Sequence, residues 1–258
     1  MNIKQSVTGL LLRGLRIAGL LLVIYVSMVF YLALTERRNA YPRAITHTEA
    51  EAAIQNTANP ITCTLADGTV LSGWSIGNTQ DPVLLYYPDA DEDAAQFLAE
   101  VQQIQGLTLV SFNLRGSASN KGTPSADTFE PDAKEIAECA SQVNGQKPVA
   151  LAGRGTGAIL AAEQLGDGQK VVLIDPVLSI ADAISDKYRF LYPKFLVRAK
   201  EKLPIERLKK RISQVFLLFD RQTHCDRNHK VVSEIPLICV KYRQQSTLSE
   251  ALKNILFE

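Results

Sequence analysis

The sequence is short of the residues that most often indicate a function by themselves. It has three histidines, one tryptophan and four cysteines, and no cysteine pair has C-x-x-C or zinc-finger spacing. Lysine and arginine (28) nearly balance aspartate and glutamate (27), so the positive excess typical of nucleic-acid binding is missing. No internal repeat or low-complexity tract is present. We therefore expect no metal, no cofactor and no nucleic-acid partner.

The cysteines are too far apart in sequence to indicate a pairing. They are Cys63, Cys139, Cys225 and Cys239, of which the last two are nearest to each other. Cysteine is commonly buried as a free thiol, and this is the preferred interpretation. A disulfide formed in an oxidising compartment is the alternative.

The first 40 residues differ from the rest because they contain a long apolar run. Residues 17–34 carry no charge. A helix of this length, rising about 1.5 Å per residue, just spans a bilayer core of about 30 Å. The run is longer than the apolar part of a usual signal peptide, and no clear cleavage site follows. We therefore expect a short N-terminal segment (1–16) and an uncleaved transmembrane anchor (17–34), rather than a signal peptide or a buried helix.

Basic side chains barely decide which side of the membrane the globular part occupies. Three precede the apolar run and three follow it: Lys4, Arg13, Arg16, Arg37, Arg38 and Arg43. A short basic N-terminus is usual for an anchor whose globular part is exported. The expectation is therefore a single-pass protein with its domain on the non-cytoplasmic side.

The rest of the chain alternates between apolar strands and amphipathic helices. After a polar juxtamembrane linker (35–59) with a short helix at 47–56, residues 60–258 form one domain. Strands are predicted at 61–65, 69–76, 82–87, 107–112, 149–152, 170–174, 214–219 and 236–241. Helices are predicted at 91–105, 131–143, 155–165 and 246–257. This order predicts an α/β fold whose mostly parallel central sheet is covered by helices on both faces.

Residues 176–212 interrupt this alternation and are expected to form a small helical insertion, or cap, over one end of the sheet. Helices are predicted at 180–188 and 195–203, followed by the basic run RLKKR at 207–211. The run could bind anionic lipid. A solvated helix face is the preferred interpretation.

One stretch combines a strand, a glycine-rich turn and a helix start: residues 148–160, PVALAGRGTGAIL. This layout matches a nucleophile elbow, in which G-x-S-x-G raises a serine above a sheet. The outer glycines, Gly153 and Gly157, are present, with Arg154 and Thr156 between them. The central position holds Gly155, which has no side chain to act as a nucleophile.

Other motifs accompany the elbow. Residues 67–74 match D-G-x-x-L-x-G-W, and the NLRGSASNKGTPS run at 113–125 is similar to a D-Y-R-G-x-G-x-S-x-G-x-P-S loop. Asp-Pro at 175–176 and Tyr-Pro at 192–193 add to the pattern. On these residues the chain, over about 60–257, resembles the α/β-hydrolase superfamily, and within it the membrane-anchored branch of α/β-hydrolase-domain serine hydrolases. The loop would place Asn113, Arg115 and Gly116 in a binding role or, preferably, a structural one.

The resemblance implies a serine nucleophile, an acid, a histidine and an oxyanion motif, and none stands in its usual place. Tyr-Pro-Asp-Ala (87–90) replaces the histidine-glycine run of the oxyanion motif, the acid frame falls on 220–223, and residues 242–246 contain no histidine. The triad works as a unit. We therefore expect a catalytically inactive protein, or pseudo-hydrolase, that binds or scaffolds a protein or lipid partner.

An active esterase, thioesterase or peptidase with relocated groups is the alternative. Thr156 lies beside the central position of the elbow, although a threonine in a first helical turn usually satisfies backbone groups. Water could instead be activated by histidine and aspartate side chains after the seventh strand, although loop polarity explains such a cluster more often. Those candidates are Asp220, His224, Asp226 and His229.

Overall fold

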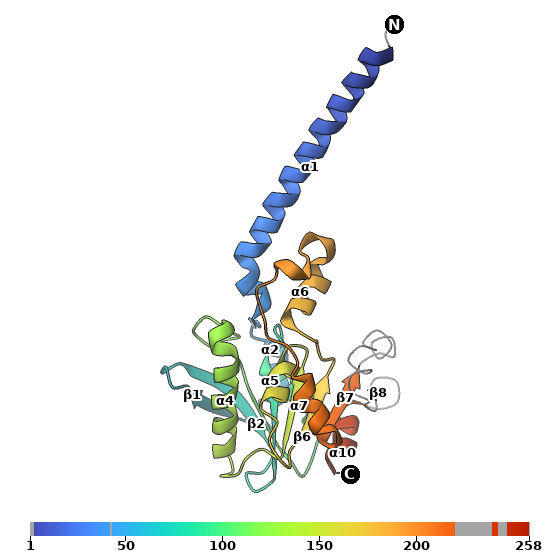
Figure 1. Ribbon diagram of the computed structural model, residues 1–258. Coiled ribbons are helices and arrows are strands. Elements are labelled where there is room, and N and C mark those ends of the chain that lie inside the picture. The colour runs from blue at the N-terminus through green and yellow to red at the C-terminus, as the bar shows by residue number, and fades with distance from the viewer. Residues whose placement is uncertain (1–2, 42, 220–238, 242–246, 258) are drawn as a thin grey trace.

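A computed structural model describes residues 3–41, 43–219, 239–241 and 247–257 of the chain (Figure 1). The strands are β1 (Ala58–Thr64), β2 (Val70–Ile76), β3 (Val83–Tyr87), β4 (Thr108–Phe112), β5 (Ala150–Arg154), β6 (Lys170–Ile174), β7 (Val215–Phe219) and β8 (Cys239–Lys241). The α-helices are α1 (Ile3–Ala40), α2 (Thr48–Ile54), α3 (Ala94–Val101), α4 (Ala126–Gln142), α5 (Gly157–Glu163), α6 (Ile180–Tyr188), α7 (Ile205–Lys210) and α10 (Leu248–Phe257). Short 3₁₀ helices are η1 (Arg189–Leu191), η2 (Lys194–Leu196) and η3 (Ile212–Gln214).

The strands form one eight-stranded sheet in the order β1-β2-β4-β3-β5-β6-β7-β8. β1 pairs antiparallel with β2, and β2 antiparallel with β4, as expected for an opening hairpin at the edge. From β4 to β8 every pairing is parallel; Leu85 of β3, for example, lies opposite Leu151 of β5. The predicted α/β architecture with a mostly parallel sheet is confirmed.

Apolar side chains cover both faces of the sheet, as continuous apolar strands require. On one face Leu85 and Tyr87 of β3 join a core formed with α4, α5, the cap and the C-terminal part of α1. On the other face Leu84 and Tyr86 join a core formed with α2, α3 and α10. Both helical layers are therefore needed to bury the strands.

Helix starts differ from the predicted ones where side chains cap the backbone. The helix predicted from residue 131 begins at Ala126, because Ser125 and Thr128 form a reciprocal capping box ahead of it. Pro131, the first residue of the predicted helix, therefore lies inside α4. α2 is capped by His47, whose Nδ1 accepts from Ala50 N.

The helix predicted at 195–203 is wrong. After η2 the chain runs extended, and its backbone bonds to the segment that precedes α6: Leu203 N donates to Leu178 O (2.8 Å) and Ile180 N to Glu201 O (3.1 Å). A bridge between Ser179 and Lys202 completes this pairing. The helical periodicity of this segment is local, whereas its backbone hydrogen bonds join it to a segment about 23 residues away. A local sequence pattern does not reveal such bonds.

α1 is continuous across the boundaries expected at residues 16 and 34, and it extends far beyond the sheet (Figure 1). Its Leu11–Ala40 part is long and apolar enough to cross a membrane, and only 6% of its most apolar window is buried. The other end packs on the domain, where Leu32, Glu36, Ala40 and Tyr41 are buried. The segment expected to be a linker is therefore part of the folded domain.

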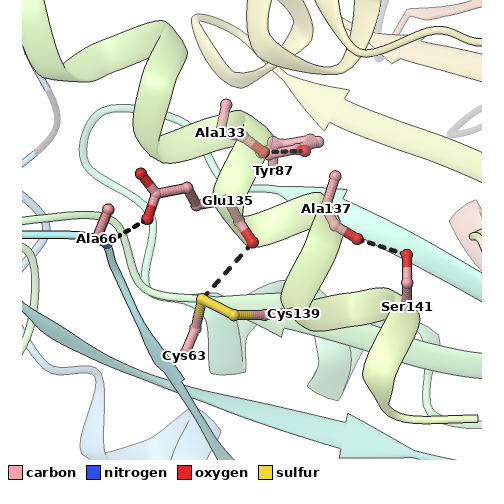
Figure 2. The surroundings of a disulfide bond; sticks show 8 residues. All are labelled: Cys63, Ala66, Tyr87, Ala133, Glu135, Ala137, Cys139 and Ser141. Atoms are coloured by element: carbon pink, nitrogen blue, oxygen red, sulfur yellow. Dashed lines mark hydrogen bonds between the residues drawn. A yellow bond between two sulfur atoms is a disulfide. The ribbon is translucent and has the colours of Figure 1, made fainter. Parts of the chain in front are cut away.

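A disulfide joins β1 to α4 (Figure 2). Cys63 and Cys139 are bonded with their Cα atoms 5.6 Å apart, across a sequence separation of 76 residues. The expectation of free thiols is wrong for this pair, because pairing depends on where β1 and α4 pack rather than on spacing. Cys225 lies outside the described residues, and the Cys239 side chain is not among those described.

Candidate functional site: a degenerate nucleophile elbow

The glycine-rich turn interpreted as an elbow lies between the end of β5 and the start of α5. Gly155 has a φ of +54°, the left-handed conformation that a raised nucleophile requires. Its N–H donates to Ile174 O (3.0 Å). A Cβ on Gly153 would overlap the backbone of Gly157, and one on Gly157 would overlap Tyr87 O. Helix and strand therefore approach too closely for any side chain at the two outer positions.

The space above Gly155 is occupied by the Asp89 carboxylate. A Cβ on Gly155 would overlap both Asp89 oxygens. One of them, Oδ1, accepts from Thr156 N (2.8 Å), Thr156 Oγ1 (2.8 Å) and Ala90 N (2.7 Å). Asp89 therefore stands where a nucleophile would be raised.

The same contacts occupy the oxyanion hole. In this elbow geometry the hole is made by the N–H after the nucleophile and an N–H from the loop after the third strand. Those donors are here Thr156 N–H and Ala90 N–H, and both point at Asp89 Oδ1. Asp89 Oδ1 therefore accepts from the two N–H groups that correspond to oxyanion-hole donors in that geometry. The sequence indicated only that residues 87–90 replace the histidine-glycine run of the oxyanion motif.

Thr156 has a different role from the first-turn cap expected of it. It is the N-cap residue of α5, but its side chain makes no capping bond. Its hydroxyl donates to Asp89 instead, and the residue is 6% exposed. The hydroxyl therefore donates to an oxygen that already accepts from two backbone N–H groups.

A partly buried ion network holds the loop that carries Asp89. Arg154, the second residue of the elbow, pairs with Glu92 (2.5 Å) and with Glu100 of α3 (2.9 Å). Glu92 also accepts from Tyr86 Oη and from Asp89 N (3.1 Å). Burial raises the pKa of the Glu92 carboxyl. Glu92 and Glu100 were not singled out from the sequence, because their connection to Arg154 spans about 60 residues.

A cavity of about 260 Å³ remains above the elbow. Its floor includes Asp89 and Thr156, and its walls are the C-terminal part of α1 and one side of α6. Arg38, Arg43 and Lys187 bring positive charge to it. A second cavity, of about 420 Å³, involves Lys147 and Gln169 at the opposite end of β5, away from the elbow.

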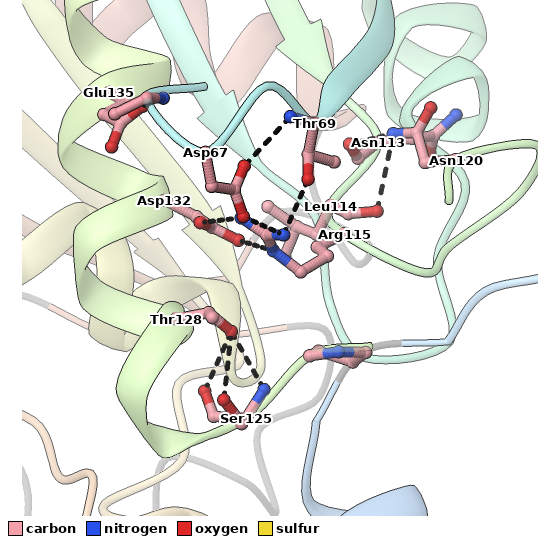
Figure 3. Close-up of polar contacts among 12 residues, drawn as sticks. Asp67, Thr69, Asn113, Leu114, Arg115, Asn120, Ser125, Thr128, Asp132 and Glu135 are labelled. Carbon is pink, nitrogen blue, oxygen red and sulfur yellow. Dashed lines mark hydrogen bonds and ion pairs between the residues drawn. The ribbon is translucent and has the colours of Figure 1, made fainter. Parts of the chain in front are cut away.

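The loop at 113–125 is a structural tie (Figure 3). Arg115 binds both oxygens of Asp132 on α4 (2.7 and 2.8 Å) and also contacts Asp67 (2.7 Å) and Thr69 (2.8 Å) of the β1–β2 hairpin. The guanidinium lowers the pKa of the Asp67 carboxyl to about 2. Asn113, 2% exposed, accepts from Ala94 N (2.9 Å) and donates to Asp93 (3.1 Å).

Gly116 has a φ of +75° at the turn of the same loop, next to Pro124. Arg115 and Asn113 therefore connect the hairpin, α4 and α3, whereas the contacts of Gly116 stay within the loop. These contacts are consistent with the structural role preferred for the three residues.

Four sequence candidates, Asp220, His224, Asp226 and His229, lie outside the described residues. The remaining histidine, His47, caps α2 and its backbone N–H donates to Asp93 (2.8 Å). In the described part of the chain, no cluster of three or more histidine, cysteine or acidic side chains could hold a metal ion.

Comparison with solved structures identifies the fold. An α/β hydrolase from Vibrio vulnificus superposes with a TM-score of 0.62 at 18% identity, covering 87% of this chain and 89% of that one. The chain has the α/β-hydrolase fold. An esterase from Pyrococcus furiosus (TM-score 0.56, 14% identity, 84% and 96% covered) and a proline iminopeptidase-related protein from Thermus thermophilus (0.57, 15%, 78% and 97%) are also similar.

At these identities the similarity concerns the fold alone. No protein-family model matches the sequence, and no curated protein matches it either. Within the α/β-hydrolase fold, chemistry depends on the residues at the elbow and around it rather than on the architecture. The contacts of Gly155, Asp89 and Thr156 must therefore carry any statement about activity.

Proposed function

We propose that this protein is a membrane-anchored α/β-hydrolase-fold module that binds or scaffolds a partner and lacks serine-hydrolase activity. One observation carries the proposal: the Asp89 carboxylate fills the space over Gly155 and accepts from both oxyanion-hole N–H groups. An acyl-enzyme mechanism needs a nucleophile in that space and free donors at that hole. In this protein the Asp89 carboxylate occupies both the space over Gly155 and these two donors.

The membrane part of the proposal rests on α1. Its apolar side chains are exposed for most of its length; Leu20 and Phe30, for example, are 62% and 64% exposed. So much apolar surface on one helix is costly in water and favourable in a bilayer. The Cys63–Cys139 disulfide supports a domain on the oxidising, non-cytoplasmic side.

Activity-based labelling tests the proposal. The full chain in detergent, at neutral pH, is exposed to a fluorophosphonate probe that reacts with activated serine and threonine hydroxyls. An unrelated active serine hydrolase in the same detergent is the positive control. We expect no labelling of the native protein. Labelling at Thr156, or at a serine of the 113–125 loop, would overturn the proposal.

An esterase with relocated groups is the second candidate, because the structural neighbours include proteins named as esterases and a thioesterase domain. Turnover of short-chain esters by the native chain, abolished by His224→Ala or Asp220→Ala, would establish water activation by those side chains. We expect no turnover above that of the Asp220→Ala/His224→Ala double variant. This assay detects hydrolysis by an activated water molecule, which a fluorophosphonate probe does not label.

A further inference from the structure

The cap exposes two phenylalanines in its two successive 3₁₀ helices. Phe190 of η1 is 77% exposed and Phe195 of η2 is 84% exposed, the highest value among the large apolar side chains of the described residues. Leu196, beside Phe195, is 36% exposed. A cluster of exposed apolar side chains indicates a contact with another apolar phase.

The segment that contains these phenylalanines is rich in basic residues. Residues 187–202 contain six basic side chains and a single acid, Glu201. The basic residues are Lys187, Arg189, Lys194, Arg198, Lys200 and Lys202. All six are exposed; Lys194 pairs with Asp182 of α6 (2.6 Å), and the other five form no ion pair among the described residues. Glu201 is only partly exposed and accepts from Tyr41 Oη (2.9 Å). Apolar side chains among cations are typical of a surface that lies on an anionic bilayer.

This part of the cap lies beside the apolar length of α1. Tyr25 Oη donates to Phe190 O (3.3 Å), and Tyr188 Oη donates to Asn39 Oδ1 (3.0 Å). Figure 1 shows the end of α6 and the turns after it as the part of the domain that reaches farthest along α1. The contact at Tyr25 falls inside the uncharged run of residues 17–34.

The length of α1 that precedes the cap determines how close to the bilayer the cap lies. The apolar part of the helix begins at Leu11. From Leu11 to Tyr25 is about 21 Å at about 1.5 Å per residue, whereas a bilayer core is about 30 Å thick. The part of α1 beyond the cap is therefore too short to cross the core alone. The bilayer must include some of the helix that lies alongside Phe190.

We propose that the tip of the cap, residues 189–196, is a second membrane contact, with Phe190 and Phe195 in the interfacial layer and the basic side chains of this segment on anionic phospholipid headgroups. The proposal rests on the membrane anchoring proposed for α1. It places the cavity over the degenerate elbow next to the lipid surface, because Lys187 borders both.

The basic run at 207–211 takes no part in this surface. Arg207 pairs with Glu163 (2.7 Å) and Arg211 with Asp167 (2.5 Å), on the helix and turn that lead away from the elbow. Lys209 pairs with Glu206 of its own helix (3.0 Å). These pairs support the solvated helix face preferred for the run.

Tryptophan quenching by brominated lipid tests the proposal on the full chain in vesicles. The single tryptophan, Trp74, is first replaced (Trp74→Phe), and Phe195→Trp is added as the reporter. Tyr31→Trp, at an exposed position of α1, reports the anchor. Val149→Trp, exposed at the amino end of β5, is the control outside the membrane. We expect brominated lipid to lower the tryptophan emission at positions 195 and 31 and to leave the emission at position 149 unchanged.

Each other outcome has a distinct meaning. Quenching at 31 without quenching at 195 overturns the cap contact and leaves the anchor intact. Absence of quenching at both positions overturns the anchor and the cap contact together. In vesicles of zwitterionic lipid alone, we expect weaker quenching at 195 and unchanged quenching at 31. Equal quenching at 195 in both lipids would overturn the role given to the cations.

Discussion

At Gly155 two separate physical requirements act on one residue. Its φ of +54° strains any residue with a Cβ, and the Asp89 carboxylate occupies the direction in which that Cβ would point. The neighbouring Asp89 is held by three donors from Thr156 and Ala90. A side chain at 155 must therefore displace a carboxylate that is already satisfied.

A double-mutant cycle measures this conflict. We expect Gly155→Ser to lower the free energy of unfolding by about 2 kcal/mol, because the serine either overlaps Asp89 or breaks its hydrogen bonds. In an Asp89→Gly background the same substitution has room, and its cost falls to about 1 kcal/mol from the positive φ. Denaturant unfolding of the four proteins gives the coupling.

Additive costs in that cycle would show that Asp89 does not occupy the space above Gly155. Gly155→Ser alone is also expected to leave the protein unlabelled by a fluorophosphonate, since it supplies neither a histidine nor a free oxyanion hole. A robustly active Gly155→Ser variant would contradict the proposed loss of catalysis.

At the scale of elements, the β1–β2 hairpin depends on ties to α4. β1 is an edge strand that pairs with β2 alone. Arg115 joins the hairpin to Asp132 on one side, and the Cys63–Cys139 disulfide joins β1 to α4 on the other. The edge of the sheet is thus fixed by side-chain contacts and a covalent bond as well as by its ladder.

Removal of the Cys63–Cys139 disulfide should lower the stability of the protein. Opening a loop of 76 residues restores unfolded-chain entropy, and we expect Cys63→Ala/Cys139→Ala to lower the free energy of unfolding by about 4 kcal/mol. Urea unfolding of both proteins, with and without reductant, measures this. Reductant should destabilise the native chain far more than the double variant; equal effects would mean that this pair is not bonded.

At the scale of the whole molecule, α1 packs on the domain in addition to carrying the apolar run proposed as a membrane anchor. Glu36, 6% exposed, accepts from Tyr192 Oη (2.7 Å), Arg198 N (2.6 Å) and Ala199 N (3.0 Å). Burial and this carboxylate raise the pKa of Tyr192 to about 12. The C-terminal turns of α1 therefore hold the cap in place and form one wall of the cavity over the elbow.

Two shortened chains separate the two roles of α1. A chain beginning at residue 25 keeps Leu32, Glu36 and Tyr41, and we expect it to unfold at nearly the temperature of the full protein. A chain beginning at residue 43 loses these contacts, and we expect it to be less stable by at least about 3 kcal/mol. Thermal unfolding and trypsin cleavage after Arg189 and Lys194 measure the difference. Equal stability would show that α1 is only an anchor.

The α/β architecture was predictable from residue patterns because burial on two faces demands continuous apolar strands such as residues 84–87. The elbow was predictable because Gly153 and Gly157 leave a local signature of close approach. Helix limits were less predictable: Ser125 moved the start of α4, and backbone bonds to Leu178 and Ile180 replaced the helix predicted at 195–203.

By itself the sequence determined what is local: an apolar helix, the order of strands and helices, a turn whose central residue has no side chain. Tertiary structure decided what depends on contacts between distant segments. It brought Asp89 over Gly155 from a loop 66 residues earlier, joined Cys63 to Cys139, and set Glu36 among the donors of the cap. Such contacts depend on how the sheet and its helices pack, and no local spacing encodes that packing.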